Sequence, residues 1–282
     1  MADIATINGV AEDNVAIVNS AADDTLTTGN GLTWAHSYEI DGSGLWAASG
    51  TNYLEEVFTT ASPNKRKFTV SAWVKPSTFA TRQVIFDAEA PTGTSYGLYC
   101  RMHTDGRLQI HYDGTSSGTS KTSAVVMSST SRYYHIVVAF DTTQATAANR
   151  NRIYVDGSEV TVVNGADGGT GVMPVRNLDT DWGHANTEFK IGLRAVDNDL
   201  PWRGNIASIA VLDNQQLAAS DFAKTVASVW TPKDLSGLTF NNNSFWIEGG
   251  VDMIAGTDSS GNGFRFVKTG TITNDSTDSP TN

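Results

Sequence analysis

Residues 133–157, which read as two strands and the turn of a hairpin, constrain the fold more than any other stretch of the sequence. In the first nine of them apolar and mixed positions alternate, which is the two-residue period of a β-strand. After a polar loop a second apolar run ends at Asp156-Gly157, a pair that tolerates the positive φ angles of a primed turn. With this turn Ile153 faces Val160 and the apolar faces agree. The stretch therefore predicts antiparallel strands with one buried face.

A second hairpin follows from the phase of the side chains in residues 98–112. The apolar faces agree only if Met102 opposes Leu108 and Cys100 opposes Ile110, which requires a loop with an odd number of residues. Thr104-Asp105-Gly106 is then a three-residue turn with a left-handed glycine.

The outward face of this second hairpin is a candidate sugar-binding surface. On it, Tyr99 stands opposite His111 and Arg101 opposite Gln109, and aromatic rings stack on sugar faces while forked donors hold hydroxyl groups. The alternative is an ordinary solvent-exposed sheet face with no ligand. The full set of candidate glycan contacts is Tyr99, Arg101, Gln109, His111, Trp182 and Trp202.

Four motifs in order along the chain resemble one family. The run Y-x-H-x-V-x-x-F-D at residues 133–141, followed by I-Y-V-D-G, resembles the strand pair of laminin G-like and pentraxin-like domains of the concanavalin A class. Residues 68–76, 189–192 and 202–222 resemble the early, late and closing strands of the same family. The resemblance implies an all-β, laminin G-like jelly-roll sandwich of two antiparallel sheets.

The chain is then expected to hold one domain with two arms, since a single β-sandwich can reach 282 residues. The predicted divisions are an N-terminal arm at 1–33, the jelly roll at 34–230 and a C-terminal arm with one or two strands at 231–282. The one helix expected lies near residues 220–230, capped by Ser220, because Phe222, Val226 and Val229 share a helical face.

Both arms carry apolar residues that would cost free energy if left in water. Residues 4–14 and 15–25 form a tandem repeat, each unit an apolar strand and a polar turn, although a disordered terminus is an alternative. The phrase I-x-x-I-N-G-V near the start and residues 258–263 resemble segments of tailed-bacteriophage structural proteins. The predicted docking residues are Ile4, Ile7, Val15, Ile17, Val18, Phe245, Trp246, Phe264 and Phe266.

Charge and composition exclude several classes of function. A net charge of −11 argues against nucleic acid, whose binding depends on clustered Lys and Arg. No apolar run is long enough to insert in a membrane, and no signal peptide is visible. Cys100 is the only cysteine, so no intrachain disulfide can form, and its apolar neighbours favour a core position over a catalytic thiol.

Two loops carry paired aspartates next to a tryptophan and are candidate metal sites. Carboxylate oxygens suit Ca²⁺, and calcium at the sandwich rim is common in the laminin G-like family. The candidate ligands are Asp179, Asp181, Asp197 and Asp199. The alternative is solvated loops in an acidic protein, so no cofactor is required and calcium is a candidate only. Trp73, on the polar phase of its strand, is expected either to lie under another segment or to face a ligand.

One catalytic interpretation is disfavoured by a missing residue. Glu39-Ile40-Asp41 begins the E-I-D-x-x-E motif of laminarinase-type glucanases, in which a retaining mechanism needs two carboxyl groups about 5–5.5 Å apart. Gly44 stands where the second glutamate is needed, so the leaving oxygen has no proton donor. The chain is therefore expected not to be an enzyme.

The function expected from the sequence is that of a virion structural protein of a tailed phage, as a head-decoration or fibre subunit or a tail adhesin. The jelly roll would face outward and bind glycan, while the arms dock on other virion proteins and favour self-association. The alternative is a freestanding glycan-binding lectin, which does not need the arms.

Overall fold

The chain folds into two separate units, Met1–Glu39 and Ile40–Asn282. The computed structural model describes residues 6–7, 10–11, 25–27, 33–35, 38–47, 51–91, 97–112, 118–122, 124–164 and 173–281. The first unit contains two small hairpins. In one, β1 (Thr6–Ile7) pairs with β2 (Val10–Ala11), and in the other β3 (Thr25–Thr27) pairs with β4 (Thr33–Ala35). The predicted docking residues Ile4, Val15, Ile17 and Val18 lie outside the described residues, as does the side chain of Ile7.

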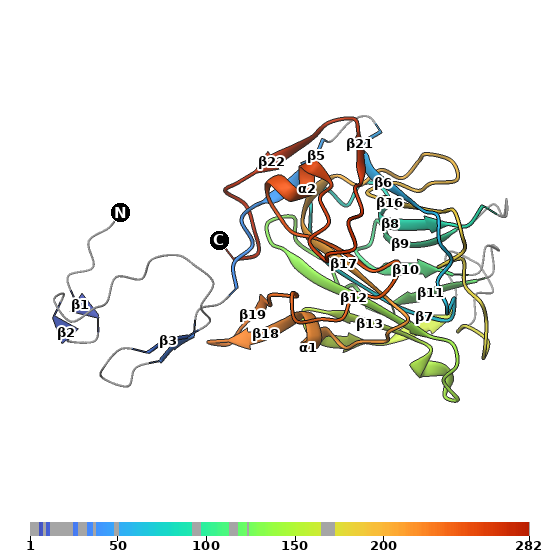
Figure 1. Ribbon diagram of the computed structural model, residues 1–282, viewed down its shortest axis with the longest axis horizontal. Helices are drawn as coiled ribbons and strands as arrows, with labels where there is room; N and C mark the ends of the chain where they lie inside the picture. Colours follow the sequence, from blue (N-terminus) through green and yellow to red (C-terminus); the bar gives the residue numbers. More distant parts are fainter. Residues whose placement is uncertain are drawn as a thin grey trace. The chain divides into compact units, whose positions relative to one another are not determined.

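The second unit is a sandwich of two antiparallel sheets, as predicted (Figure 1). The strand order of the first sheet is β15-β11-β10-β9-β8-β16-β6-β21. Its strands are β6 (Tyr53–Phe58), β8 (Gln83–Glu89), β9 (Leu98–Met102), β10 (Leu108–His111), β11 (Thr119–Thr122), β15 (Val162–Asn164), β16 (Thr187–Ile191) and β21 (Val267–Thr269).

The second sheet has the order β14-β13-β12-β7-β17-β5-β22, with β20 paired to β17. Its strands are β5 (Ser43–Trp46), β7 (Lys67–Pro76), β12 (Tyr134–Asp141), β13 (Asn151–Val155), β14 (Ser158–Val160), β17 (Gly204–Asp213), β20 (Phe245–Ile247) and β22 (Ile272–Asp275). A single turn of 3-10 helix, η2 (Ala147–Asn149), precedes β13. Both sheets contribute buried apolar side chains to one core.

Both predicted hairpins are confirmed in register. Ile153 pairs with Val160, and Met102 pairs with Leu108. The two turns have the backbone that their sequences require, with φ of 48° at Asp156 and 76° at Gly106. Local side-chain phase alone was sufficient for these elements, because a shift of one residue would have turned every apolar side chain outward.

Cys100 lies in the core, as expected. Its side chain is fully buried on β9, and burial raises the pKa of its thiol well above the usual value. A thiol of this kind does not ionise near neutral pH, so it is not a nucleophile.

The predicted helix near residues 220–230 is wrong beyond its first turn. Helix α1 (Ala219–Phe222) is followed by a hairpin of two strands, β18 (Ala223–Val226) and β19 (Val229–Pro232). Asp221, rather than Ser220, makes the capping contact, since its side chain accepts from the Ala218 N–H at 2.8 Å. The β-branched residues of this segment suit a strand as well as a helix, and packing on the sheet decides between them.

The segment predicted as a C-terminal arm is part of the sandwich. β20 pairs with β17, β21 with β6 and β22 with β5, so residues 245–275 join both sheets. A second helix, α2 (Val251–Ala255), which the sequence did not predict, buries Met253 against the core.

The docking interpretation of this segment is corrected accordingly. Phe245, Trp246 and Phe266 are at most 4% exposed, and Phe264 packs against the core. Phe245 lies 4.7 Å from Phe266 and 5.2 Å from Phe189, ring centroid to centroid. These aromatic side chains therefore stabilise their own domain and are not available to dock on a partner.

Within the described ranges, no helix has the length and apolar character that crossing a membrane requires.

Candidate functional site

The predicted sugar-binding face of β9 and β10 has the predicted pairs but is not open. Tyr99 stacks on His111 with ring centroids 5.0 Å apart, and Arg101 Nε donates to Gln109 Oε1 at 2.7 Å. All four side chains are at most 9% exposed. These four side chains are covered by their neighbours, and none of them lines the pocket described below.

Trp182 and Trp202 are wrong as glycan contacts, because both are fully buried in the core. Trp182 packs edge-on against Phe58 and donates its indole N–H to Asp213 Oδ1 at 2.9 Å. A tryptophan beside an acidic loop thus marked a core position.

Three of the four candidate aspartates in the acidic loops form ion pairs with arginine side chains. Asp179 accepts from Arg66 Nε at 2.6 Å, and Arg194 contacts both Asp197 and Asp199 at 2.6 Å. Asp181 is 8% exposed. In the part of the chain that the structure describes, no group of three or more His, Cys, Asp or Glu side chains is placed to hold a metal ion. Calcium binding at these loops stays a prediction.

A serine–histidine pair on the outer face of the second sheet has the contacts of a catalytic dyad, but the histidine is the hydrogen-bond donor in it. His135 Nε2 lies 2.9 Å from Ser71 Oγ, and His135 Nδ1 lies 3.0 Å from the indole nitrogen of Trp230. Because an indole N–H can only donate, Nδ1 accepts and the ring proton sits on Nε2. His135 therefore donates to Ser71 and cannot take its proton. Burial lowers the pKa of His135 to about 3, so the ring is neutral.

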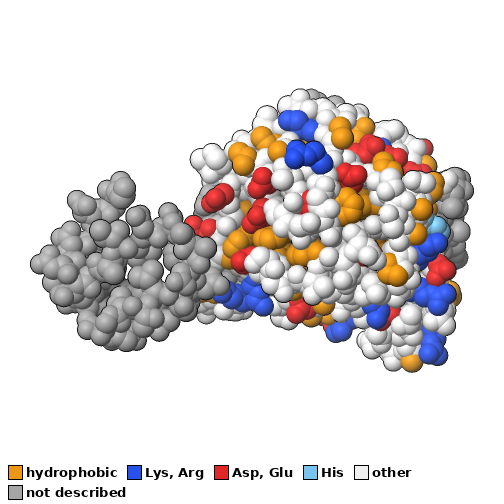
Figure 2. Space-filling model, in the orientation of Figure 1, with side chains coloured by type: hydrophobic (Ala, Val, Ile, Leu, Met, Phe, Trp, Pro, Cys, Tyr) orange, Lys and Arg blue, Asp and Glu red, His pale blue; other side chains and the backbone are white. Residues whose placement is uncertain are grey.

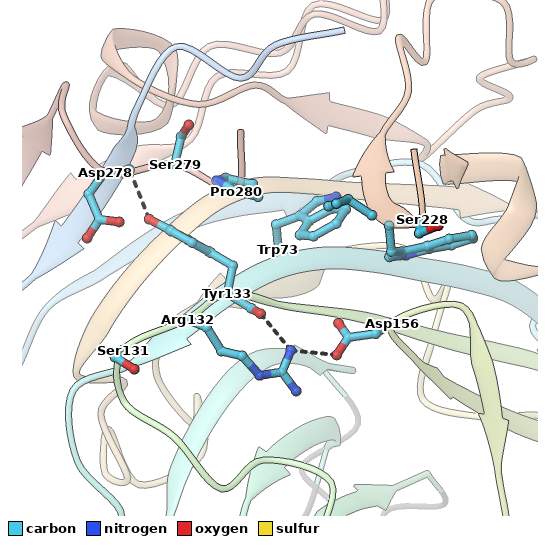
Figure 3. Close-up of a pocket in the computed structure, with 11 residues that line it drawn as sticks. Trp73, Ser131, Arg132, Tyr133, Asp156, Ser228, Asp278, Ser279 and Pro280 are labelled. Atoms are coloured by element: carbon cyan, nitrogen blue, oxygen red, sulfur yellow. Dashed lines mark hydrogen bonds and ion pairs between the residues drawn. The ribbon is translucent and has the colours of Figure 1, made fainter. Parts of the chain in front are cut away.

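Next to this pair lies a pocket of about 480 Å³, within the size range of small-ligand sites (Figure 3). Its described lining comes from β7, the residues just before β12, the β13–β14 turn, the turn and second strand of the β18–β19 hairpin, and the C-terminal segment. The lining residues are Trp73, Ser131, Arg132, Tyr133, Asp156, Ser228, Val229, Trp230, Asp278, Ser279 and Pro280.

Trp73 forms the floor of this pocket, and it is covered, which is one of the two alternatives that the sequence left open. Its ring stacks on His135 at 4.6 Å, and only 6% of the residue is exposed. It is therefore covered for the most part, and the exposed remainder lines the cavity.

Figure 2 shows a band of hydrophobic side chains across the middle of the face above hairpin β18–β19, with acidic and basic side chains interspersed around it.

One wall is the C-terminal strap, residues 276–281. Tyr133 Oη donates to the Asp278 carbonyl oxygen at 2.9 Å, and the Asp278 carboxylate forms an ion pair with Lys75. Burial raises the pKa of Tyr133, so the phenol stays protonated and keeps this donor. Thr281 Oγ1 accepts from the Ile40 N–H at 3.3 Å, which ties the end of the strap to the domain.

The opposite wall is the β18–β19 hairpin, held by Trp230. Besides its bond to His135, the Trp230 ring packs on Gly157, where an added Cβ would lie 3.0 Å from it. The hairpin turn places Ala227 and Ser228 at φ of 47° and 68°. Two successive left-handed residues form the two-residue primed turn of a β-hairpin, although alanine and serine are uncommon in this conformation.

At the lower edge of the pocket as Figure 3 draws it, Arg132 and Asp156 form an ion pair, with Arg132 Nη1 2.7 Å from Asp156 Oδ2. Although burial opposes it, the hydrogen bond and the charge of Asp156 raise the pKa of Arg132. The sequence had singled out Asp156 only as a turn residue, and it gave no reason to connect Arg132, Trp230 or Asp278 with Trp73. The sequence signal for this site was the position of Trp73 on the polar face of its strand.

The fold and the sequence together define the class of protein. Residues 48–220 match the model of a laminin G domain of the concanavalin A-like lectin/glucanases superfamily. The chain belongs to this superfamily, which confirms the resemblance seen in the strand motifs.

Solved structures with the same fold are distant in sequence. A putative carbohydrate-binding protein from Bacteroides ovatus is 15% identical, with 84% of this chain and 60% of that chain covered and a TM-score of 0.51. A pentraxin from Limulus polyphemus is also 15% identical, with 64% and 80% covered and a TM-score of 0.43. Domains LG4-5 of the mouse laminin α1 chain are 15% identical, with 65% and 46% covered and a TM-score of 0.43. No curated protein matches the sequence.

Proposed function

We propose that this protein is a carbohydrate-binding module without catalytic activity, and that its ligand binds in the pocket at Trp73. The observation that carries the proposal is the composition of that pocket. Its aromatic rings, Trp73, Tyr133 and Trp230, lie beside a fixed ion pair and several hydroxyl groups. Aromatic faces combined with a few placed polar groups suit a sugar, which has an apolar ring face and a polar rim.

The glucanase alternative gains no support from the structure. Gly44, at the position of the missing acid, packs against the core, where a Cβ would lie 2.8 Å from Met253. A glutamate there would have its carboxyl group buried and away from any substrate. The Ser71–His135 pair does not replace the missing acid. The ring proton of His135 is on Nε2 and is donated to Ser71, so the histidine cannot take the serine proton.

The wider role that we propose is that of a tailed-phage structural protein, a head-decoration or fibre subunit or a tail adhesin, which would place the protein in the virion. Support comes from the division of the chain into two units, Met1–Glu39 and Ile40–Asn282. The first carries the phrase I-x-x-I-N-G-V, which resembles the opening of tailed-phage structural proteins, and it would dock the sugar-binding unit on another virion protein or on a second copy. A freestanding lectin has no need of such a segment.

The sugar-binding proposal is tested with a glycan array and two variants. The wild-type protein is expected to bind at least one glycan, and Trp230→Ala is expected to weaken that binding at least tenfold, or about 1.4 kcal/mol, because one pocket wall is lost. Phe240→Ala is the control, since Phe240 is also a partly buried aromatic residue but lies outside the pocket. An array without any bound glycan, or equal binding by Trp230→Ala, would contradict the proposal.

The proposed docking role of the N-terminal unit is tested by deleting residues 2–35. Because the sandwich strands begin at Ser43, the deletion is expected to leave the melting temperature within about 2 °C of the full-length value. Incorporation into particles, measured by mass spectrometry of purified virions, is expected to fall at least tenfold. If the shortened protein still enters particles at the normal copy number, the docking role is wrong.

A further inference from the structure

We infer that the Trp73 pocket selects neutral sugars over acidic ones, and that the Arg132–Asp156 pair binds two adjacent hydroxyl groups of the ligand. This inference rests on the proposed function and concerns the class of sugar bound at the same site. It follows from the pairing of charges around the pocket and from the way the ion pair is fixed.

Each charged residue that lines the described pocket has a partner of opposite charge. Arg132 contacts Asp156 at 2.7 Å, and Asp278 is paired with Lys75. A sugar carboxylate would find no uncompensated cation there. A carboxylate that reached the exposed donors of Arg132 would lie beside the carboxylate of Asp156, and two like charges would then share a partly desolvated site. The chain as a whole, with a net charge of −11, adds to this repulsion.

The guanidinium of Arg132 is held on three sides. Its Nη1 donates to Asp156 Oδ2 and, at 3.2 Å, to the Tyr133 carbonyl oxygen. Its central carbon lies 3.7 Å from the ring centroid of Tyr134. About half of the side chain remains exposed, so ligand groups can reach the remaining N–H donors.

Asp156 is fixed as well. Its second oxygen, Oδ1, accepts from the backbone N–H of His135 at 2.9 Å, and the residue occupies a left-handed position in the β13–β14 turn. Since neither partner has to be ordered when a ligand arrives, the pair costs little entropy to use.

A fixed arginine beside a fixed aspartate presents donors next to an acceptor. A hydroxyl group both donates and accepts, so two adjacent hydroxyls can satisfy both partners without separating the charges. A carboxylate only accepts, and it can satisfy Arg132 alone. Figure 3 shows this pair on one side of Trp73 and the C-terminal strap on the other, so a ring lying on Trp73 would turn its rim toward the pair.

The test uses the full-length protein and matched oligosaccharides. Each neutral sugar is paired with its uronic-acid counterpart, in which one CH₂OH group is a carboxylate, and dissociation constants are measured by titration calorimetry. The wild-type protein is expected to bind the neutral member at least tenfold more tightly.

Asp156→Asn is the decisive variant. It keeps a side-chain oxygen for the His135 N–H but leaves the charge of Arg132 uncompensated. The preference is expected to shift toward the acidic member at least tenfold. Arg132→Met is expected to weaken binding of the neutral member at least tenfold. Glu159→Gln is the control, since Glu159 forms an equivalent ion pair with Arg152 outside this pocket, and it should change neither preference nor affinity.

Different results would contradict sugar binding and the preference for neutral sugars. If no neutral or acidic sugar binds, the proposed function is wrong and the inference falls with it. If acidic sugars bind as tightly as their neutral partners, or if Asp156→Asn and Glu159→Gln give the same preference, sugar binding stands and the inference alone is contradicted.

Discussion

Replacing Phe245 with alanine is expected to lower the free energy of unfolding by about 3–5 kcal/mol, a large part of the stability of an ordinary domain. Phe245 is fully buried on β20, and its ring lies within 6.0 Å of the rings of Phe58, Phe189 and Phe266. Removing it would leave a cavity that these rigidly packed rings cannot fill. Urea unfolding followed by tryptophan fluorescence measures the loss.

Val267→Ala is the matched control for this experiment. Val267 is 68% exposed on β21, in the same C-terminal segment, and its truncation is expected to change the free energy of unfolding by less than about 0.5 kcal/mol. If Phe245→Ala has an equally small effect, the segment is not part of the core and the docking interpretation of its aromatic residues returns.

The second large effect concerns His135 and acid. Burial lowers the pKa of His135 in the folded protein to about 3, whereas the unfolded chain titrates near about 6.5. Between these values the unfolded state binds the extra proton. The contribution of His135 to stability is therefore complete above about pH 6.5 and is lost as the pH falls toward 3, by at most about 1.4 kcal/mol per pH unit.

A non-titrating residue should remove this dependence. His135→Gln is expected to flatten the fall of unfolding free energy between about pH 6 and 4, compared with wild type, whatever its own stability. Asp87 titrates in the same range with the opposite sign, because burial raises its pKa to about 8. The quantity to compare is therefore the difference in unfolding free energy between wild type and His135→Gln at each pH. Ser71→Ala, which removes a hydrogen bond but no titrating group, should keep the wild-type slope, and an unchanged slope in His135→Gln would contradict the assignment.

The parts of the fold that could be predicted from sequence are those determined locally. The turn at Gly106 and the pairing of Met102 with Leu108 follow from the phase of neighbouring side chains, which the sheet must respect. The burial of Cys100 follows from the same phase. The strand motifs that resemble the laminin G-like family extend this local information to the strands between residues 48 and 220.

The parts that could not be predicted depend on contacts between distant segments. The helical pattern after Ser220 ends in a hairpin that packs on the sheet, where the Trp230 indole bonds to His135, 95 positions earlier in the chain. Phe245 and Phe266 were correctly expected to need cover, but the sequence could not tell a partner protein from their own domain.

The candidate site was missed for the same reason. Tyr133 and Asp278 meet across 145 positions, and no local pattern connects them with Trp73. The solvent exposure of the candidate residues could not be predicted from the sequence either. Tyr99 and His111 have the residue types of a sugar site and the predicted pairing, yet they are buried.

The most direct test of sugar binding at this pocket is a crystal structure of the protein with the neutral sugar that binds most tightly. The sugar is expected between the C-terminal strap and the β18–β19 hairpin, with its ring against Trp73 and adjacent hydroxyl groups on Arg132 and Asp156. An ordered sugar bound elsewhere, with the Trp73 pocket holding only water, would contradict the account.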